Sequence, residues 1–369
     1  MRVLFSAVPV AGHVLPMMAM ASAAQADGHE VAVLTGEGLR ELVAPVPLLG
    51  AGPTIEEQVA ETVRRTGRRW AGPGPEAAEM FAGTRVDITY DEALARARAF
   101  SPDLVICDSC DYVGPTLAPA VDADWATHGI AGALPPPFVD AMDERWADQL
   151  RARGLQARPR LGHVDPYPDL LRDPGELSPA DRLPVRFTAF DRPGATYRPP
   201  RFEDDTLPRV LLTLGSSVGD PRLTAALADS LAEATVNVLV TDDAPTDAPD
   251  DRGASPRIRY TGFVPLARLL PDVDLVVSAG GTGTMLSALA AGLPLVIQPR
   301  LADQPLNARR ATRQGAARTI ADSAEAGAAA HEVLTSPGYG RAARQVMHEI
   351  GARPAPADVL AQLAARIPA

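Results

Sequence analysis

The apolar residues of this chain come in short runs, and each run is followed by a small-residue turn and a helical pattern. Val3–Val8 and Glu30–Thr35 are predicted to be buried strands, with a helix over residues 13–26 between them. The same order of strand, turn and helix recurs after Val210–Leu214 and after Leu275–Val277. Because strands that alternate with helices form parallel sheets, the pattern predicts an α/β fold with a parallel sheet in each half of the chain.

Proline-rich and glycine-rich segments interrupt this pattern. Leu104–Cys107 and Asp124–Ile130 predict further strands of the first sheet, and residues 134–138 read as a rigid polyproline-like loop. Residues 158–208 combine prolines with charges, so we interpret them as the end of the first domain and a linker. Residues 311–350 are predicted to be helical with breaks.

A chain of 369 residues is long enough for two domains, each with its own core. The predicted boundaries are a first domain over 1–184, a linker over 185–207, a second domain over 208–350 and a C-terminal helix within 351–369. The second boundary is the clearer one, because a buried strand begins directly at Val210.

The net charge of −11 argues against nucleic acid or an anionic membrane as a partner. An acidic protein that binds phosphate groups must therefore hold them with local dipoles rather than with a basic patch. The N-terminus runs directly into a strand without a signal peptide, and no apolar run reaches the length of about 18 residues that a membrane span needs. We therefore expect a cytoplasmic location.

Two motifs that could hold a metal have a simpler interpretation. Cys107 and Cys110 form C-x-x-C, but a zinc site needs about four ligands and no second Cys/His pair lies nearby. Residues 122–124 and 272–274 spell Asp-x-Asp, yet both precede predicted strands and so lie at the amino ends of the sheets. The cysteines are expected to be a buried strand-end residue and a loop thiol, and no metal is expected.

The most informative stretch is residues 274–310, where a strand meets the small-residue turn Ser278–Thr284 and then a helix. Free backbone N–H groups and the positive end of the helix dipole meet at such a turn, so a phosphate could bind there. Asp303 and Gln304 follow the next strand and would face the same crevice. An ordinary tight turn is the alternative, and a dinucleotide fingerprint fits poorly because Met285 and its neighbours replace the third glycine.

Together with Asn307-Ala308, this stretch closely resembles the donor signature of family 1, GT-B-fold glycosyltransferases of bacterial natural-product pathways. That signature reads His-Gly-Gly-x-Gly-Thr and then Asp-Gln-x-x-Asn-Ala, and this chain departs from it at Ala279, which replaces the histidine that contacts the donor diphosphate. A second match, some 270 residues away, is Gly12-His13 with Pro16 after the first strand. Taken alone, His13 would be a polar residue at a helix start.

The resemblance implies the GT-B architecture: two facing Rossmann-like domains, a cleft between them and a last helix that crosses back to the first domain. It implies that His13 is the catalytic base. The first and fourth strands should be neighbours in the sheet, so Asp108 could orient His13, as an Asp does in the family, with Asp111 as the alternate. A strand-end Asp is otherwise commonly a helix cap.

The resemblance also implies a donor site and, less specifically, an acceptor site. The acceptor site would include Gly12, Phe138 and Trp146, although a core position for the two aromatic residues is equally compatible with the sequence. The expected donor-binding residues supply backbone N–H groups, hydroxyls, an aromatic turn and sugar contacts: Gly215, Ser216, Ser217, Phe263, Val264, Gly280, Gly281, Thr282, Gly283, Thr284, Asp303 and Gln304.

The implied reaction is an inverting, metal-independent transfer of a sugar from a TDP- or UDP-sugar to a small-molecule natural product, with no cofactor. The alanine-rich composition, with arginine preferred over lysine, fits a high-GC bacterial pathway in which TDP-deoxysugars are common donors. Ala279 leaves open a catalytically weakened sugar-nucleotide-binding auxiliary protein. A nicotinamide-dependent oxidoreductase is disfavoured by the absent fingerprint, while a homodimer and an activator protein both remain open.

Overall fold

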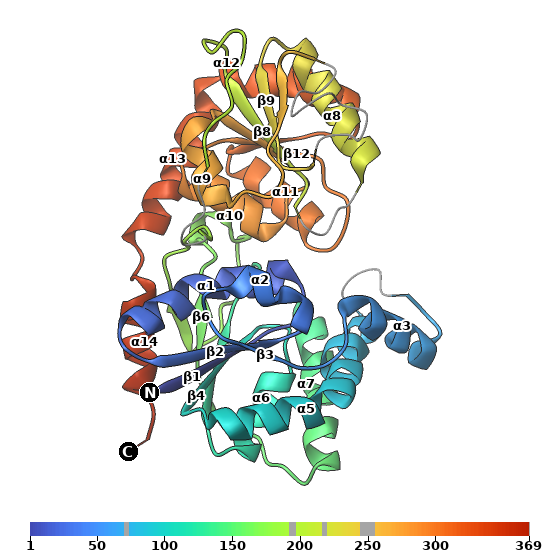
Figure 1. Ribbon diagram of the computed structural model, residues 1–369, viewed down its shortest axis with the longest axis vertical. Helices are drawn as coiled ribbons and strands as arrows, with labels where there is room; N and C mark the ends of the chain where they lie inside the picture. Colours follow the sequence, from blue (N-terminus) through green and yellow to red (C-terminus); the bar gives the residue numbers. More distant parts are fainter. Residues whose placement is uncertain (70–73, 192–196, 216–219, 244–254, 369) are drawn as a thin grey trace. The chain divides into compact units, whose positions relative to one another are not determined.

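The computed structural model describes residues 1–69, 74–191, 197–215, 220–243 and 255–368. The chain divides into two compact units (Figure 1). Unit 1 comprises Met1–Tyr167, Gly175–Arg186 and Arg353–Ala369, and unit 2 comprises Pro168–Pro174 and Phe187–Ala352. The C-terminal residues thus belong to unit 1, while residues 168–174 count with unit 2 although the sequence placed them in the first domain.

A seven-stranded parallel sheet forms the centre of unit 1, in the order β3-β2-β1-β4-β5-β6-β7. Its strands are β1 (Arg2–Ser6), β2 (Glu30–Thr35), β3 (Leu48–Gly50), β4 (Leu104–Asp108), β5 (Asp124–His128), β6 (Arg160–Asp165) and β7 (Arg182–Pro184). β1 pairs with β4, so that Ser6 lies opposite Cys107. The strand order changes direction between β1 and β4, and ligands of such sheets bind at the carboxyl ends of the strands at this point.

Helices cover both faces of this sheet. They are α1 (Ala11–Ala26), α2 (Arg40–Val43), α3 (Ile55–Thr66), α4 (Pro75–Ala78), α5 (Arg85–Phe100), α6 (Val113–Ala120), α7 (Pro136–Ala152) and α14 (Pro356–Ala364), with short helical turns η1 (Glu37–Leu39) and η2 (Glu79–Thr84). α1 packs against α14 on one face, and α5 packs against α6 on the other (Figure 1). α14 therefore completes the cover of the first sheet from the far end of the sequence.

Unit 2 repeats the plan with a six-stranded parallel sheet in the order β10-β9-β8-β11-β12-β13. Its strands are β8 (Arg209–Thr213), β9 (Asn237–Val240), β10 (Ile258–Tyr260), β11 (Leu275–Ser278), β12 (Leu295–Ile297) and β13 (Ala317–Thr319). Its helices are α8 (Pro221–Glu233), α9 (Leu266–Leu269), α10 (Thr282–Ala290), α11 (Gln304–Arg313), α12 (Ala326–Thr335) and α13 (Pro337–Ala352), with turns η3 (Asp169–Leu171), η4 (Leu270–Asp272) and η5 (Ser323–Glu325). Two Rossmann-like parallel-sheet units, as expected from the sequence, are thus confirmed.

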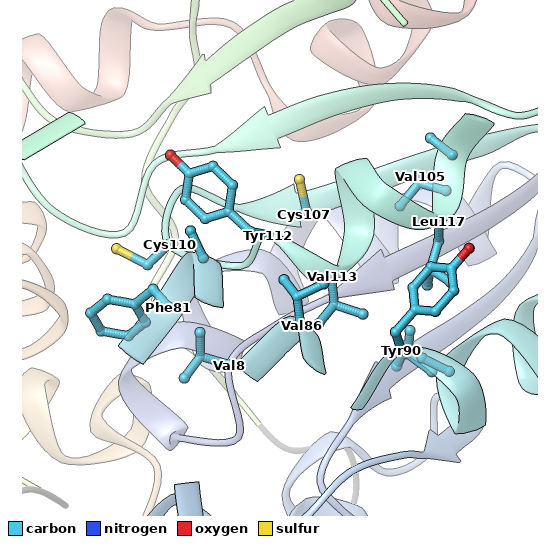
Figure 2. Close-up of a cluster of buried hydrophobic side chains, with 14 of the residues drawn as sticks. Val8, Phe81, Val86, Tyr90, Val105, Cys107, Cys110, Tyr112, Val113 and Leu117 are labelled. Atoms are coloured by element: carbon cyan, nitrogen blue, oxygen red, sulfur yellow. The ribbon is translucent and has the colours of Figure 1, made fainter. Parts of the chain in front are cut away.

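The core of unit 1 contains the side chains that separate the sheet from α5 and α6. Figure 2 shows Val8, Phe81, Val86 and Val113 in this cluster, together with both cysteines. Neither Cys107 nor Cys110 forms a disulfide, and burial raises the pKa of Cys107 well above its usual range. A thiol that resists ionisation is a poor nucleophile. This supports the interpretation of Cys107 as a buried strand-end residue without a chemical role.

The structure differs from the sequence prediction where prolines and short strands meet. The predicted loop at 134–138 contains the start of α7, because Pro136 occupies a first-turn position where a helix needs no N–H donor. The predicted linker region 158–208 contains β6 and β7. β7 is a three-residue strand at the edge of the sheet, and its last residue is Pro184. A proline is tolerated there because the outer side of an edge strand pairs with no other strand and needs no N–H donor. β13 similarly interrupts the helical region predicted over 311–350.

In the part of the chain that the structure describes, no helix combines the length and the apolar character needed to cross a bilayer.

The stability of unit 1 should depend on the protonation of His128, the last residue of β5. His128 is buried, its Nδ1–H donates to the carbonyl of Gly129 at 2.8 Å, and burial lowers its pKa from 6.5 to about 4. Between these values the unfolded chain binds the proton and the folded protein does not, so stability falls as the pH falls through this window. From pH 7 to pH 5 the loss from this group should be about 2 kcal/mol.

Urea unfolding at both pH values, followed by tryptophan fluorescence, tests this, because Trp125 and Trp146 lie in unit 1. His128→Asn should lose about 2 kcal/mol less stability than the wild type over the same interval. An equal loss in both proteins would contradict a neutral, buried His128.

Candidate functional site

His13 and Asp108 lie in contact at the carboxyl ends of β1 and β4. His13 belongs to the first turn of α1, which begins five residues after the last residue of β1, and Asp108 is the last residue of β4. The distance from His13 Nδ1 to Asp108 Oδ1 is 3.1 Å. The pairing of the first and fourth strands, which the sequence suggested, therefore brings these two side chains together.

The surroundings of Asp108 fix the orientation of the imidazole. The Asp108 carboxylate is 1% exposed and also accepts the backbone N–H groups of Val8 at 2.8 Å and Cys110 at 2.7 Å. An ionised carboxylate only accepts hydrogen bonds, so this contact requires a hydrogen on Nδ1 of His13, and a neutral imidazole with that hydrogen has its lone pair on Nε2. The His13 side chain is 17% exposed, which leaves part of it open to a reactant.

Asp111, the alternate partner that the sequence offered, is bound elsewhere. Its Oδ1 accepts from Arg85 Nε at 2.7 Å, and its Oδ2 accepts the hydroxyl of Ser6 at 2.5 Å. Both Arg85 and Asp111 are almost fully buried. The structure therefore places Asp108 at the histidine, and the ion pair behind it was missed because the sequence gives no sign that Arg85 reaches this edge.

The expected acceptor residues have different environments. Gly12 is exposed beside His13, and a Cβ on it would meet no atom within 4 Å. Phe138 is 7% exposed and belongs to the hydrophobic core, against which the half-buried Trp146 packs. Trp146 also donates its Nε1–H to Thr116 at 3.0 Å. The two aromatic residues thus have the core positions that were the alternative, while Phe81, which the sequence did not single out, lies 6.1 Å from the His13 ring between centroids.

The glycine turn of unit 2 lies between β11 and α10. Gly280 has φ of +84°, and a Cβ there would come within 2.6 Å of Ile297 Cγ2, so this position needs glycine. At Gly281 and Gly283 a Cβ would meet nothing within 4 Å. Gly281 is the N-cap residue of α10, where unsatisfied N–H groups point out of the helix. The turn therefore combines the N-terminus of α10 with open space beside two of its glycines.

A group of hydrogen bonds ties this turn to the start of α11. Thr282 donates its hydroxyl to Asp303 Oδ2 at 2.6 Å, and Asn307 Nδ2 lies 2.8 Å from the same oxygen. Asn307 Nδ2 also lies 3.0 Å from the carbonyl of Gly280. Asn307 was part of the quoted motif but was not proposed as a site residue. Its contacts indicate that it holds the two loops together.

Gln304, an expected donor residue, and Ala279, the departure from the motif, are both buried. Gln304 is 4% exposed, and its Oε1 accepts the backbone N–H groups of Arg300 and Leu301, both at 2.9 Å, so it organises the loop. Ala279 is 1% exposed and packs in the core of unit 2. A histidine at this position would have to displace core atoms, which explains why a small residue fits here.

The other expected donor residues lie around the same edge or outside the described residues. Gly215 adopts φ of +74°, and a Cβ on it would lie 3.9 Å from Thr284 Oγ1. Phe263 is 67% exposed in the turn before α9, whereas Val264 is half-buried. Ser216 and Ser217 lie outside the residues that the structure describes.

The Asp-x-Asp sequences lie at the amino ends of the strands. Asp122 pairs with Arg158 at 2.7 Å just before β5, and Asp274 accepts the backbone N–H of Arg209 at 2.9 Å just before β11. Within the described ranges, no group of three or more His, Cys, Asp or Glu side chains is arranged to hold a metal ion.

Comparisons with known proteins agree on one family. The model of the erythromycin biosynthesis protein CIII-like C-terminal domain matches residues 225–366. The chain is 30% identical to L-demethylnoviosyl transferase of Streptomyces niveus, covering 99% of this chain and 98% of that protein. It is 29% identical to the elloramycin glycosyltransferase of Streptomyces olivaceus, covering 98% and 97%.

A solved structure with a similar fold is that of the glycosyltransferase SsfS6 of Streptomyces sp. SF2575, complexed with thymidine diphosphate. The TM-score is 0.83 at 27% identity, with 99% of both chains covered. The match therefore extends over both parallel-sheet units rather than one. With this fold and 30% identity over nearly its whole length, the chain belongs to the family 1 natural-product glycosyltransferases, enzymes of the GT-B fold.

Proposed function

We propose that this glycosyltransferase moves a deoxysugar from a TDP- or UDP-sugar to a small-molecule natural product, with inversion at the anomeric carbon and His13 as general base. The observation that carries the proposal is the contact of 3.1 Å between His13 Nδ1 and Asp108 Oδ1 at the carboxyl edge of the first sheet. The names of the relatives and the thymidine diphosphate bound by SsfS6 support the choice of donor and acceptor class.

In this mechanism the acceptor hydroxyl loses its proton to Nε2 of His13 as its oxygen attacks the anomeric carbon. The attack comes from the face opposite the leaving diphosphate, so one displacement inverts the configuration. Asp108 keeps the proton on Nδ1 before the reaction and stabilises the imidazolium afterwards. A histidine titrates near neutrality in its reference state, and general-base help of this kind is worth about 10²–10⁴ in rate.

The leaving diphosphate would bind at the glycine turn of unit 2. The open space at Gly281 and Gly283 leaves room for phosphate oxygens at the N-terminus of α10, where N–H groups and the helix dipole stabilise negative charge. Phe263 is exposed and offers a flat surface for a nucleotide base. For the sugar hydroxyls, Oδ1 of Asp303 is the better candidate, because Oε1 of Gln304 already accepts two backbone hydrogen bonds.

The departure at Ala279 favours one alternative, a catalytically weakened sugar-nucleotide-binding auxiliary protein. The intact His13–Asp108 contact argues for an active enzyme, because a protein that only binds nucleotide sugars has no need of an oriented base. Product mass spectrometry with an array of nucleotide sugars and phenolic or polyketide acceptors distinguishes the two. Binding of TDP without any product, across a broad array, would favour the auxiliary protein.

Substitution of the proposed base tests its role. His13→Ala should leave TDP affinity nearly unchanged, because the glycine turn lies in unit 2, while transfer to a hydroxyl acceptor falls by about 10²–10⁴. Asp108→Asn should lower transfer less, because it misorients the base without removing it. The double variant should be no slower than His13→Ala, since Asp108 acts through His13. Near wild-type turnover by His13→Ala at saturating donor would refute the assignment.

Gly283→Ala tests the donor site, because it should make the protein more stable and at the same time weaken TDP binding. Gly283 lies in α10 with open space before it, so alanine should stabilise the helix by up to about 1 kcal/mol. The added methyl group should narrow the phosphate site, so calorimetry should detect weaker TDP binding. Gly338→Ala, in α13 with equally open space, is the matched control and should leave TDP affinity unchanged. Unaltered TDP affinity in Gly283→Ala would move the diphosphate elsewhere.

Metal independence is tested by chelation. If dipoles and hydroxyls alone stabilise the leaving diphosphate, turnover in EDTA should equal turnover in Mg²⁺. The described carboxylates offer no clustered ligand set for a cation, which motivates this expectation. Activity that disappears in EDTA and returns when Mg²⁺ is added would contradict it.

A further inference from the structure

A buried ion pair lies behind the His13–Asp108 contact and has no assigned role. Arg85, the first residue of α5, is 1% exposed, and Asp111, three residues after Asp108, is 2% exposed. Their side chains meet at 2.7 Å between Nε and Oδ1. The other oxygen of Asp111 accepts from the Ser6 hydroxyl at 2.5 Å and from the backbone N–H of Gly114 at 3.2 Å. The pair therefore joins α5, β1 and the start of α6.

The same guanidinium also holds the backbone that carries the proposed base. Nη2 of Arg85 donates to the carbonyl of Ala7 at 2.6 Å, and the next residue, Val8, donates its N–H to Asp108 Oδ2 at 2.8 Å. Asp108 then contacts His13. Figure 2 shows Val8 and Phe81 in the same apolar cluster. Arg85 is thus connected to His13 through one peptide unit and one carboxylate.

Stability alone is a weak reason to keep such a pair. Burial of two charges costs several kcal/mol per ion, and apolar residues of similar volume often replace a buried pair without loss. In addition, Nη1 of Arg85 is buried without a hydrogen-bond partner in the described structure. An unsatisfied buried donor costs roughly 1–3 kcal/mol more. A cost of this size next to the site indicates a role in function.

We propose that Arg85 is a positioning residue: it fixes the turn between β1 and α1 and neutralises Asp111, so that Asp108 is the one uncompensated buried carboxylate behind His13. This inference rests on the proposed function, because it acts through His13. In the absence of Arg85, the Ala7 carbonyl loses its donor and a second buried carboxylate stands three residues from Asp108. The first change would alter the position of the imidazole, and the second would alter its proton affinity.

The charged groups around His13 show which of them should influence its protonation. α1 carries no other charged residue. The charged or titratable groups on the elements around it include Asp108, Asp111, Cys107, Cys110 and Tyr112 at and after β4, Arg85 on α5, Glu79 in η2, His128 on β5, the half-buried Arg2 on β1, and the exposed Glu30, Arg40, Glu41 and Asp358 on β2, α2 and α14. Of these, Arg85 is the buried cation nearest in the hydrogen-bond chain to Asp108.

The first experiment follows the protonation of His13 itself by NMR titration of the free protein. His13→Ala identifies the His13 signal among the six histidines. Asp111→Asn leaves the Arg85 charge uncompensated, so the His13 pKa should fall by roughly one unit. Arg85→Met should raise the His13 pKa if Asp111 stays ionised. It should leave the His13 pKa unchanged if the unpaired Asp111 takes up a proton. Arg158→Met is the control: it removes a guanidinium at the amino ends of the strands of the same sheet, and it should leave the His13 pKa unchanged.

The second experiment separates charge from position. Arg85→Met/Asp111→Leu removes both members of the ion pair, so neither remains as an unpaired buried charge. This double variant therefore also serves if a single variant fails to fold. His13 should then titrate within about half a unit of the wild type, while transfer with a TDP-sugar and a phenolic acceptor falls at least tenfold. Arg85→Lys retains the charge and should recover part of that rate. In the His13→Ala background none of these substitutions should lower transfer further.

The outcomes distinguish the two proposals. An unshifted His13 pKa in Asp111→Asn, or wild-type transfer by the folded double variant, would overturn the role of Arg85 and leave the proposed base intact. Wild-type transfer by His13→Ala would instead remove the proposed base, whatever the substitutions at Arg85 do.

Discussion

The pairing of β1 directly with β4 is the constraint on which the proposed catalytic group depends. Because these two strands are neighbours, the helix that follows β1 begins beside the residue that ends β4, and His13 meets Asp108 at 3.1 Å. The close approach of α6 is part of the same arrangement, since a Cβ on Gly114 would come within 2.7 Å of Cys107 Cβ. The oriented imidazole thus results from strand order, register and one glycine rather than from a local motif alone.

Unit 2 uses the same principle for a different purpose. β8 and β11 are neighbours at the corresponding point of the second sheet, and the turn after β11 needs glycine at Gly280 for both its φ and its contact with Ile297. Asn307 and Thr282 then tie this turn to Asp303, so the loops after β11 and β12 form one hydrogen-bonded group. The first sheet therefore positions the proposed proton acceptor, and the second positions N–H donors that would stabilise an anion.

The sequence predicted the elements whose signal is strong and local. Apolar runs followed by small-residue turns identified β1, β8 and β11, and their order predicted the parallel sheets. The strands β7 and β13 were missed because three residues give no periodicity, and β7 also ends in proline. Asp108 was preferred over Asp111 from strand order, and the structure places it at His13.

Side-chain partners were harder to predict than elements. The motif around Gln304 suggested a sugar contact, but it gave no sign that Oε1 accepts two backbone hydrogen bonds from the preceding loop. Arg85 and Asp111 are separated by 26 residues, and nothing in their spacing predicts that they meet. Phe138 and Trp146 pack in the core because tertiary contacts, rather than their residue type, decide which aromatic side chains remain open.

The central claim is that Asp108 holds His13 in the tautomer whose Nε2 can accept a proton. Nitrogen chemical shifts of ¹⁵N-labelled histidine, measured well above the His13 pKa, report which ring nitrogen carries the hydrogen. The account predicts a protonated Nδ1 and an unprotonated Nε2 in the wild type, with this preference reduced in Asp108→Asn. A wild-type His13 protonated at Nε2 would contradict it.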